Sequence, residues 1–178
     1  MPGSSRGARP APPTGWNVSA GSSVSGTHAA DLALVTNTAA TLVRAVGVIR
    51  NHLKLTAMMK VVKMGDGELD LINIVTGAEP GAPGLHLTHN AGGQFAVEPP
   101  GGAPTFLAAT FAEFVLVQLE VDVTAGSYTY AIGQETGGGS LNGQATATSI
   151  YVSVGASFTS LITKAWHVRF DDITVDAR

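Results

Sequence analysis

Histidines and clustered carboxylates are the residues of this chain that could hold a metal ion. The chain has five histidines, and His86 and His89 form the one close pair. On an extended strand, residues three apart face opposite sides of the sheet, so this pair predicts no zinc site. Aspartates cluster near the end of the chain without the spacing of a calcium loop. We therefore expect no metal and no other cofactor, and the candidate ligands for a structural cation are Asp171 and Asp172.

A tyrosine on the outward face of a strand could stack on a sugar ring. Tyr151 lies in a segment whose alternate residues are aliphatic, so alternation places it on the opposite, outward face. We predict that any glycan contact lies there; the alternative is a tyrosine packed beneath a loop or a subunit. The candidate ligand-binding residues are Tyr151, Ser149, Ser153, Lys54 and Met58.

Two other tyrosines have a different expected role. With Ala125 and Gly126 at the tip of a hairpin, the register places Tyr130 opposite Val121 and puts Tyr128 on the same face. Both tyrosines are therefore expected in the core, where they cannot bind sugar.

Composition excludes several classes of protein. The net charge is -3 and 13% of residues are charged, so the chain has no electrostatic footprint for nucleic acid. Cysteine is absent, which excludes disulfides and thiolate chemistry. No apolar run is long enough for a secretory signal or a membrane-spanning helix, so we expect no membrane insertion.

The body of the chain predicts an all-β fold. Apolar residues recur with a period of two, and 22 glycines and 9 prolines supply the turns between short strands. About eleven strands in one domain indicate a two-sheet antiparallel β-sandwich. We assign residues 16–178 to this domain and residues 1–15 to an extended arm rich in Pro, Gly and Ser. The expected strands are 16–24, 31–36, 41–49, 52–64, 68–76, 85–88, 94–98, 114–123, 127–132, 145–155 and 166–176.

The last strand changes its pattern midway. Alternate apolar residues run to Phe170, and the pattern resumes at Ile173. A β-bulge at Asp171 and Asp172 explains the shift, with Phe170 in the core and an aspartate accepting backbone hydrogen bonds.

Several segments together resemble the concanavalin A-like lectin/glucanase jelly roll in its laminin-G-like form. They are the hairpin FVLVQLEVDVTAGSYTYAIGQ, the hairpin LHLTHNAGGQFAVEP, and SIYVSVG followed by WHVRFDDITVD. The resemblance covers about residues 16–176, and the galactose-binding-like jelly roll is the competing family.

This resemblance implies that the chain is a lectin, a glycan-binding module, a glycosidase or a structural domain, because the same fold carries all four. The glucanase branch carries Glu-x-Asp-x-x-Glu on one strand, which puts the nucleophile and the acid on one face. Glu68 and Asp70 begin one near match, and Glu120 and Asp122 begin another, but each lacks the last carboxylate. We therefore predict that the protein is not an enzyme.

The resulting hypothesis is a non-enzymatic structural or decoration protein of a bacteriophage virion, in the capsid or the tail. Its alternative is a freestanding glycan-binding lectin or adhesin module. The expected partners are further copies of the chain or other virion subunits, reached through the arm, and host-surface glycans. The expected location is the virion.

Overall fold

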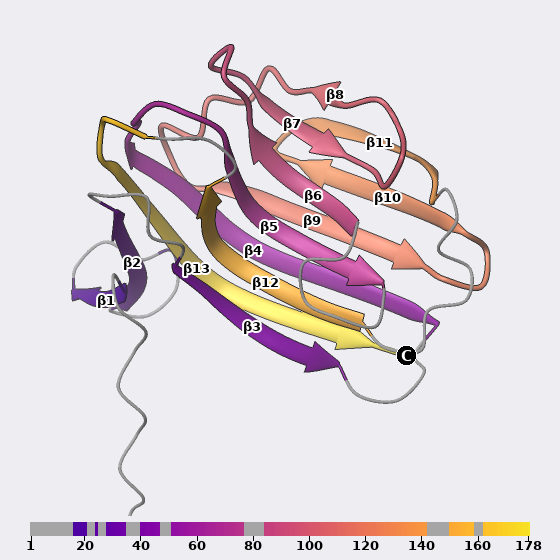
Figure 1. The fold of residues 1–178 in the computed structure, drawn as a ribbon. Coiled ribbons are helices and arrows are strands. Elements are labelled where there is room, and N and C mark those ends of the chain that lie inside the picture. The colour runs from indigo at the N-terminus through magenta and orange to yellow at the C-terminus, as the bar shows by residue number, and fades with distance from the viewer. Residues whose placement is uncertain are drawn as a thin grey trace, which may run out of the picture.

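A computed structural model describes residues 16–20, 24, 28–34, 40–46, 51–76, 84–141, 150–158 and 162–178. These residues form thirteen strands and no helix, and all strand pairs are antiparallel (Figure 1). The predicted arm, residues 1–15, lies outside them. The strands are β1 (Trp16–Ala20), β2 (His28–Leu34), β3 (Ala40–Val46), β4 (His52–Lys63), β5 (Leu69–Thr76), β6 (Gly84–His89), β7 (Phe95–Glu98), β8 (Thr105–Phe106), β9 (Val115–Asp122), β10 (Ser127–Ile132), β11 (Glu135–Ser140), β12 (Ile150–Phe158) and β13 (Trp166–Ala177).

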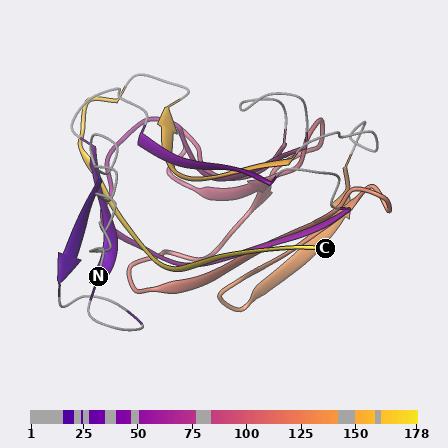
Figure 2. The ribbon, with the colours of Figure 1, turned by 90° about the horizontal axis from the view of Figure 1, so that it is seen from below.

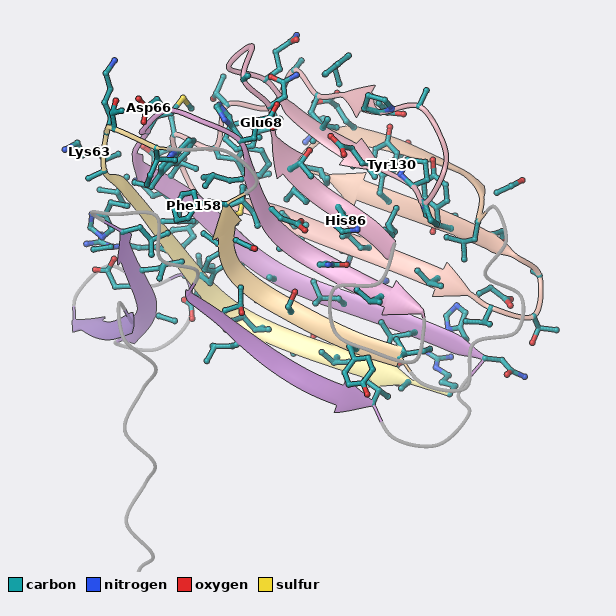
Figure 3. All side chains as sticks on the ribbon, in the orientation of Figure 1. Lys63, Asp66, Glu68, His86, Tyr130 and Phe158 are labelled. Carbon is teal, nitrogen blue, oxygen red and sulfur yellow. The ribbon has the colours of Figure 1, made fainter. Side chains whose placement is uncertain are left out.

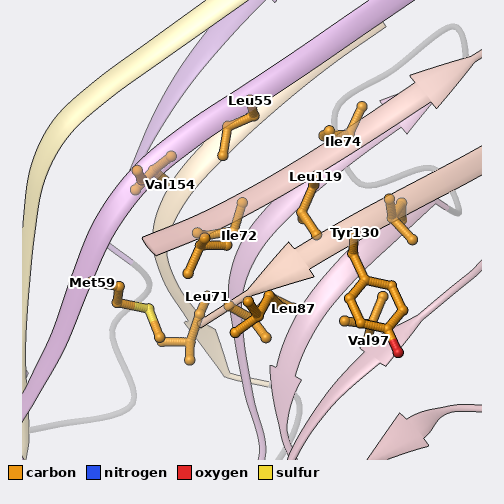
Figure 4. Close-up of a cluster of buried hydrophobic side chains, with 14 of the residues drawn as sticks. Leu55, Met59, Leu71, Ile72, Ile74, Leu87, Val97, Leu119, Tyr130 and Val154 are labelled. Atoms are coloured by element: carbon orange, nitrogen blue, oxygen red, sulfur yellow. The ribbon is translucent and has the colours of Figure 1, made fainter. Parts of the chain in front are cut away.

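The strands form two sheets, which confirms the predicted sandwich. One sheet has seven strands in the order β1-β2-β13-β4-β9-β10-β11, and the other has six in the order β3-β12-β5-β6-β7-β8. Aliphatic side chains from both sheets fill the space between them (Figure 4). Figure 2 shows the six-stranded sheet bowed, with its hollow side turned away from the other sheet. Among the described residues, no helix has the length and apolarity to cross a membrane.

The hairpin between β9 and β10 has a different register from the predicted one. Tyr130 lies opposite Leu119, not Val121, because the turn has four residues, 123–126. The Asp122 carboxylate accepts the N–H of Ala125 at 2.8 Å, which closes this longer turn. The shift is two residues, so the faces are unchanged, and Tyr128 and Tyr130 are buried as predicted.

Two strands lie where the sequence indicated no strand. β8 is only two residues long, and β11 contains a run of three glycines, Gly137 to Gly139, that reads as a turn. These glycines let β11 lie close to the tyrosines of β10. A Cβ atom on Gly137 would lie 2.5 Å from the Tyr130 hydroxyl oxygen, which no real side chain could tolerate without movement.

The bulge predicted in the last strand is present. The pairing of β13 with β4 shifts register between Asp171 and Thr174. Phe170 is fully buried, and the Asp171 carboxylate accepts the backbone N–H groups of Val24 and Asp172 at 2.7 and 2.9 Å. Asp172 has a φ of 49°, the left-handed conformation that the bulge requires. The prediction for Phe170 and Asp171 is confirmed.

Candidate functional site

A pocket of about 400 Å³ opens on the outer face of the six-stranded sheet. Its floor is formed by side chains of β5, β6 and β7 that point away from the core, and a Pro-Pro-Gly turn after β7 forms one wall. The lining residues are Glu68, Leu69, Asp70, Gly84, His86, Thr88, His89, Asn90, Glu98, Pro99, Pro100 and Gly101.

A bulge in β5 controls which side chains face this pocket. The register with β6 shifts between Asp70 and Ile72, so Leu71 and Ile72 are both buried. Asp70 therefore pairs with Thr88, and Asn73 pairs with His86, on the same face of the sheet. In a regular strand, residues 70 and 73 would face opposite sides.

Asp70 and His86 form a hydrogen-bonded pair in the floor. His86 Nδ1 lies 2.6 Å from Asp70 Oδ2, and the Gly84 N–H donates to His86 Nε2 at 3.1 Å. Since Nε2 accepts this bond, the ring proton is on Nδ1 and is donated to the carboxylate. Both side chains are largely buried, with 22% and 18% of their surface exposed, so the imidazole holds the Asp70 carboxylate in one position.

Glu98 is the second carboxylate of the floor, and it is held in a similar way. The Thr88 hydroxyl donates to Glu98 Oε1 at 2.8 Å. Glu98 belongs to β7 and lies opposite His86, so β6 runs between the two carboxylates and supplies a donor to each. Figure 3 shows His86 on β6 and Glu68 at the start of β5, on the same sheet.

Two oxygen atoms on this side of the sheet are buried without a hydrogen-bond partner: Asp70 Oδ1 and Asn73 Oδ1. The second lies beside Gly84, where a Cβ would come within 2.8 Å of it and within 2.4 Å of the Ile74 carbonyl oxygen. The Gly84 backbone therefore packs closely against β5, and no side chain fits at residue 84. Buried acceptors without donors are costly in a folded protein.

His89 contacts the pocket from the core side. Its ring packs edge-on against Trp166 and Phe95, with centroids 4.8 and 5.1 Å away, and lies 3.3 Å from the Gly67 carbonyl oxygen. Burial lowers the pKa of His89 and keeps the ring neutral, because the charged form would lose its hydration. His86 and His89 face opposite sides, as expected, and do not form a common metal site.

The candidate residues predicted from the sequence are divided between the two sheets. Tyr151 and Ser153 lie on β12, and Ser153 shares a cross-strand row with Asn73, His86 and Glu98. Ser149 lies outside the described residues. Lys54 and Met58 lie on β4, where they pair with Glu120 and Leu116 of the seven-stranded sheet. The prediction that they lie near Tyr151 is therefore wrong, because strand alternation alone does not reveal which sheet a strand joins.

The candidate cation ligands, Asp171 and Asp172, are part of the bulge in β13. The Asp171 carboxylate accepts hydrogen bonds from two backbone N–H groups. Within the described part of the chain, no group of three or more His, Asp or Glu residues is arranged to hold a metal ion.

Sequence reasoning considered Asp70 and His86 singly and did not consider Glu98. The one available signal was the near match beginning at Glu68, which lacks the last carboxylate of that pattern. In the structure a carboxylate that faces the same pocket as Asp70 comes from β7, 28 residues later in the sequence. Only the pairing of β5 with β6 and of β6 with β7 brings the two together.

Comparison of the sequence with protein-family models and with curated proteins finds no match. Solved structures do match the fold. A family 7 alginate lyase, A1-II', in complex with its product, has a TM-score of 0.64 and 11% identity over 84% of this chain and 80% of its own. The cellulose-induced protein Cip1 has a TM-score of 0.62 and 15% identity over 94% of this chain and 88% of its own. The sialidase of Trypanosoma rangeli, in complex with sialic acid, has a TM-score of 0.64 and 12% identity over 89% of this chain and 27% of its own.

These proteins share a concanavalin A-like jelly-roll sandwich, so the predicted fold is confirmed. At such low identity the likeness shows the fold alone. The expectation of a non-enzymatic virion decoration protein is nevertheless wrong, because the neighbours are alginate lyases and sialidases and none connects the chain with a phage capsid or tail.

Proposed function

We propose that this protein is a carbohydrate-active enzyme that hydrolyses a glycosidic bond in the pocket on the six-stranded sheet. The observation that carries the proposal is the pair of carboxylates, Asp70 and Glu98, each fixed by a donor from β6. Hydrolysis of a glycosidic bond needs two carboxyl groups on either side of the bond, one to protonate the leaving oxygen and one to activate water or attack the sugar.

The spacing of the strands supports this assignment. Neighbouring strands are about 4.8 Å apart, so β5 and β7 are separated by about 10 Å. Asp70 and Glu98 both lean toward β6, because each bonds a side chain of that strand. They are also offset by two residues along β6, since Asp70 pairs with Thr88 and Glu98 with His86, so it is this lean that brings the carboxyl groups toward the separation of about 5 to 9.5 Å that known hydrolases use.

His86 and Thr88 act as positioning residues in this proposal. Both nitrogens of His86 are engaged, so the imidazole orients Asp70 and does not itself transfer a proton to the sugar. The similarity to alginate lyases adds weight to a carbohydrate substrate, because the match covers 80% of the lyase chain, whereas it covers 27% of the sialidase chain.

The test is release of reducing ends from a panel of polysaccharides. Glu98→Gln and Asp70→Asn keep the shape of each side chain and remove its acid–base function, so each should lower kcat by about 10² to 10⁴. Glu113→Gln is the matched control, because Glu113 is exposed and pairs with Lys60 of the other sheet. Unchanged kcat in Glu98→Gln, products with a new double bond, or no cleavage of any polymer would overturn the proposal.

A further inference from the structure

An aromatic ring lies exposed on the edge strand of the six-stranded sheet. Among the described residues, Phe106 of β8 is the one aromatic side chain that is exposed, at 49% of its surface. The next residue, Leu107, is buried in the core, and its N–H donates to the Phe95 carbonyl oxygen of β7. Successive side chains of a strand point to opposite faces, so the Phe106 ring lies on the outer face of the sheet, where the pocket opens.

This ring belongs to a cross-strand row that passes through the pocket. Asp70 of β5 pairs with Thr88 of β6, which pairs in turn with Ala96 of β7. Ala96 pairs with Phe106 on β8, the next strand of the sheet (Figure 1). Side chains of paired residues share a face, so Asp70, Thr88 and Phe106 follow one another across the sheet. Ala96 carries a single methyl group, so no side chain of the row projects between the Thr88 hydroxyl and the ring.

The order of the strands sets the distance from this ring to the bond that the proposed function cleaves. That bond would lie over β6, between the carboxylates of Asp70 and Glu98, and β8 is two strands further along the sheet. Two strand spacings are about 10 Å, and one sugar ring of an extended glycan covers about one spacing, about 5 Å. A glycan that crosses the strands therefore places its second ring from the cleaved bond over β8.

We infer that Phe106 is a stacking platform for the sugar ring two units from the cleaved bond, in a polysaccharide whose chain crosses β6, β7 and β8. This inference rests on the proposed function. An exposed phenyl ring offers a flat apolar face and no hydrogen bond. A pyranose matches such a face when its hydroxyls are equatorial and its C–H groups point outward, as in β-linked glucans and xylans. Phe106 is thus a binding residue that selects long neutral chains of this kind.

The experiment measures retention of the full chain in affinity electrophoresis on mixed-linkage β-glucan and on xylan. We expect retention on at least one of them, weakened about three- to tenfold in Phe106→Ala because the stacked face is lost. Phe106→Trp keeps an aromatic face and should be retained at least as well as the unmodified protein. Leu116→Ala is the matched control, since it removes a comparably exposed apolar side chain, 40% exposed, from the other sheet.

Phe106→Trp also gives a readout that does not depend on the folding of Phe106→Ala. The emission of its exposed indole should shift to shorter wavelength when cellohexaose or xylohexaose is added, and the unmodified protein supplies the background. Retention on neither polymer, equal retention of Phe106→Ala and the unmodified protein, or an unchanged indole emission would overturn the inference. Equal retention with a loss of self-association in size-exclusion chromatography would overturn it in favour of a second copy that covers the ring.

The same variants separate this inference from the proposed function. Weakened retention in Phe106→Ala, with no cleavage of either polymer by the unmodified protein, would support the platform and overturn hydrolysis. Cleavage that depends on Glu98 but not on Phe106 would support hydrolysis and overturn the platform.

Discussion

Asp70 and Asn73 face the same side of β5 although they are three positions apart, an odd spacing that places residues on opposite faces of a regular strand. The bulge between Asp70 and Ile72 produces this arrangement, and it also buries Leu71 and Ile72 as neighbours in the core. One extra residue therefore puts two polar side chains on the outer face of the sheet, where Asp70 lines the pocket, without exposing an apolar one. Bulges are common beside active sites because they redirect side chains in this way.

The first prediction concerns the buried amide that results. Asn73 is 8% exposed, and its Oδ1 has no partner. Asn73→Leu removes this unsatisfied acceptor at similar volume, so it should raise the free energy of unfolding by about 1 kcal/mol while weakening glycan binding. Urea denaturation and affinity electrophoresis of the same preparation measure the two effects. A less stable variant would show that the amide is satisfied in solution.

The two-sheet fold could be predicted from the alternation of apolar residues along each strand. The site could not, because it depends on which strands pair and at which register. Alternation placed Tyr130 and Phe170 in the core, since a period of two fixes the face of each residue within a regular strand. It could not assign Lys54 to one sheet and Tyr151 to the other, because strand order is set by packing of distant segments. The pairing of Asp70 with His86 depends on a bulge, which reverses the alternation that the prediction assumed.

A second prediction tests the glycines of β11. Gly137→Ala places a Cβ 2.5 Å from the Tyr130 hydroxyl oxygen and 2.6 Å from its ring, so it should lower the free energy of unfolding by about 1 to 3 kcal/mol. Gly139→Ala is the matched control, since its Cβ would lie 3.1 Å from the Tyr128 ring and needs a smaller shift. Equal stability of the two variants in chemical denaturation would contradict this packing.

A third prediction concerns the Asp66 carboxylate, which fastens the segment before β13 to the turn before β5. It accepts hydrogen bonds from the Thr163 hydroxyl at 2.5 Å and from the N–H groups of Thr163 and Lys164, both at 2.7 Å. The Thr163 hydroxyl is the largest cause that lowers the pKa of Asp66 from 3.8 to about 2. The unfolded chain thus binds a proton at higher pH, so this stabilisation is complete above about pH 4 and is lost as the pH falls through about 2.

Thermal unfolding against pH distinguishes this contribution from others. Asp66→Asn should have a lower Tm than the unmodified protein at about pH 5, and the difference should shrink as the pH approaches about 2. A difference that is constant over that range would mean that the charge of Asp66 contributes nothing.

A fourth prediction tests the bulge in β13. Phe170 is fully buried immediately before the register shift, so Phe170→Ala should lower the free energy of unfolding by about 3 to 5 kcal/mol. Phe170→Leu, which keeps most of the apolar volume, should recover much of that loss. A loss below about 1 kcal/mol in Phe170→Ala would show that the core relaxes around the missing ring.

The last prediction concerns His89, which lies beneath the pocket. Burial lowers its pKa from 6.5, and its Nε2 is buried without an acceptor, so a proton added there would have no partner. The unfolded chain binds that proton more readily, so the contribution of His89 to stability is complete above about pH 6.5 and falls as the pH drops toward the lowered pKa.

His89→Gln cannot be protonated and should show a shallower decrease in the free energy of unfolding between about pH 7 and 5. His52→Gln is the control, because His52 is partly exposed beside Glu120. Equal slopes in the unmodified protein and His89→Gln, measured by urea denaturation across that range, would contradict a neutral, buried imidazole.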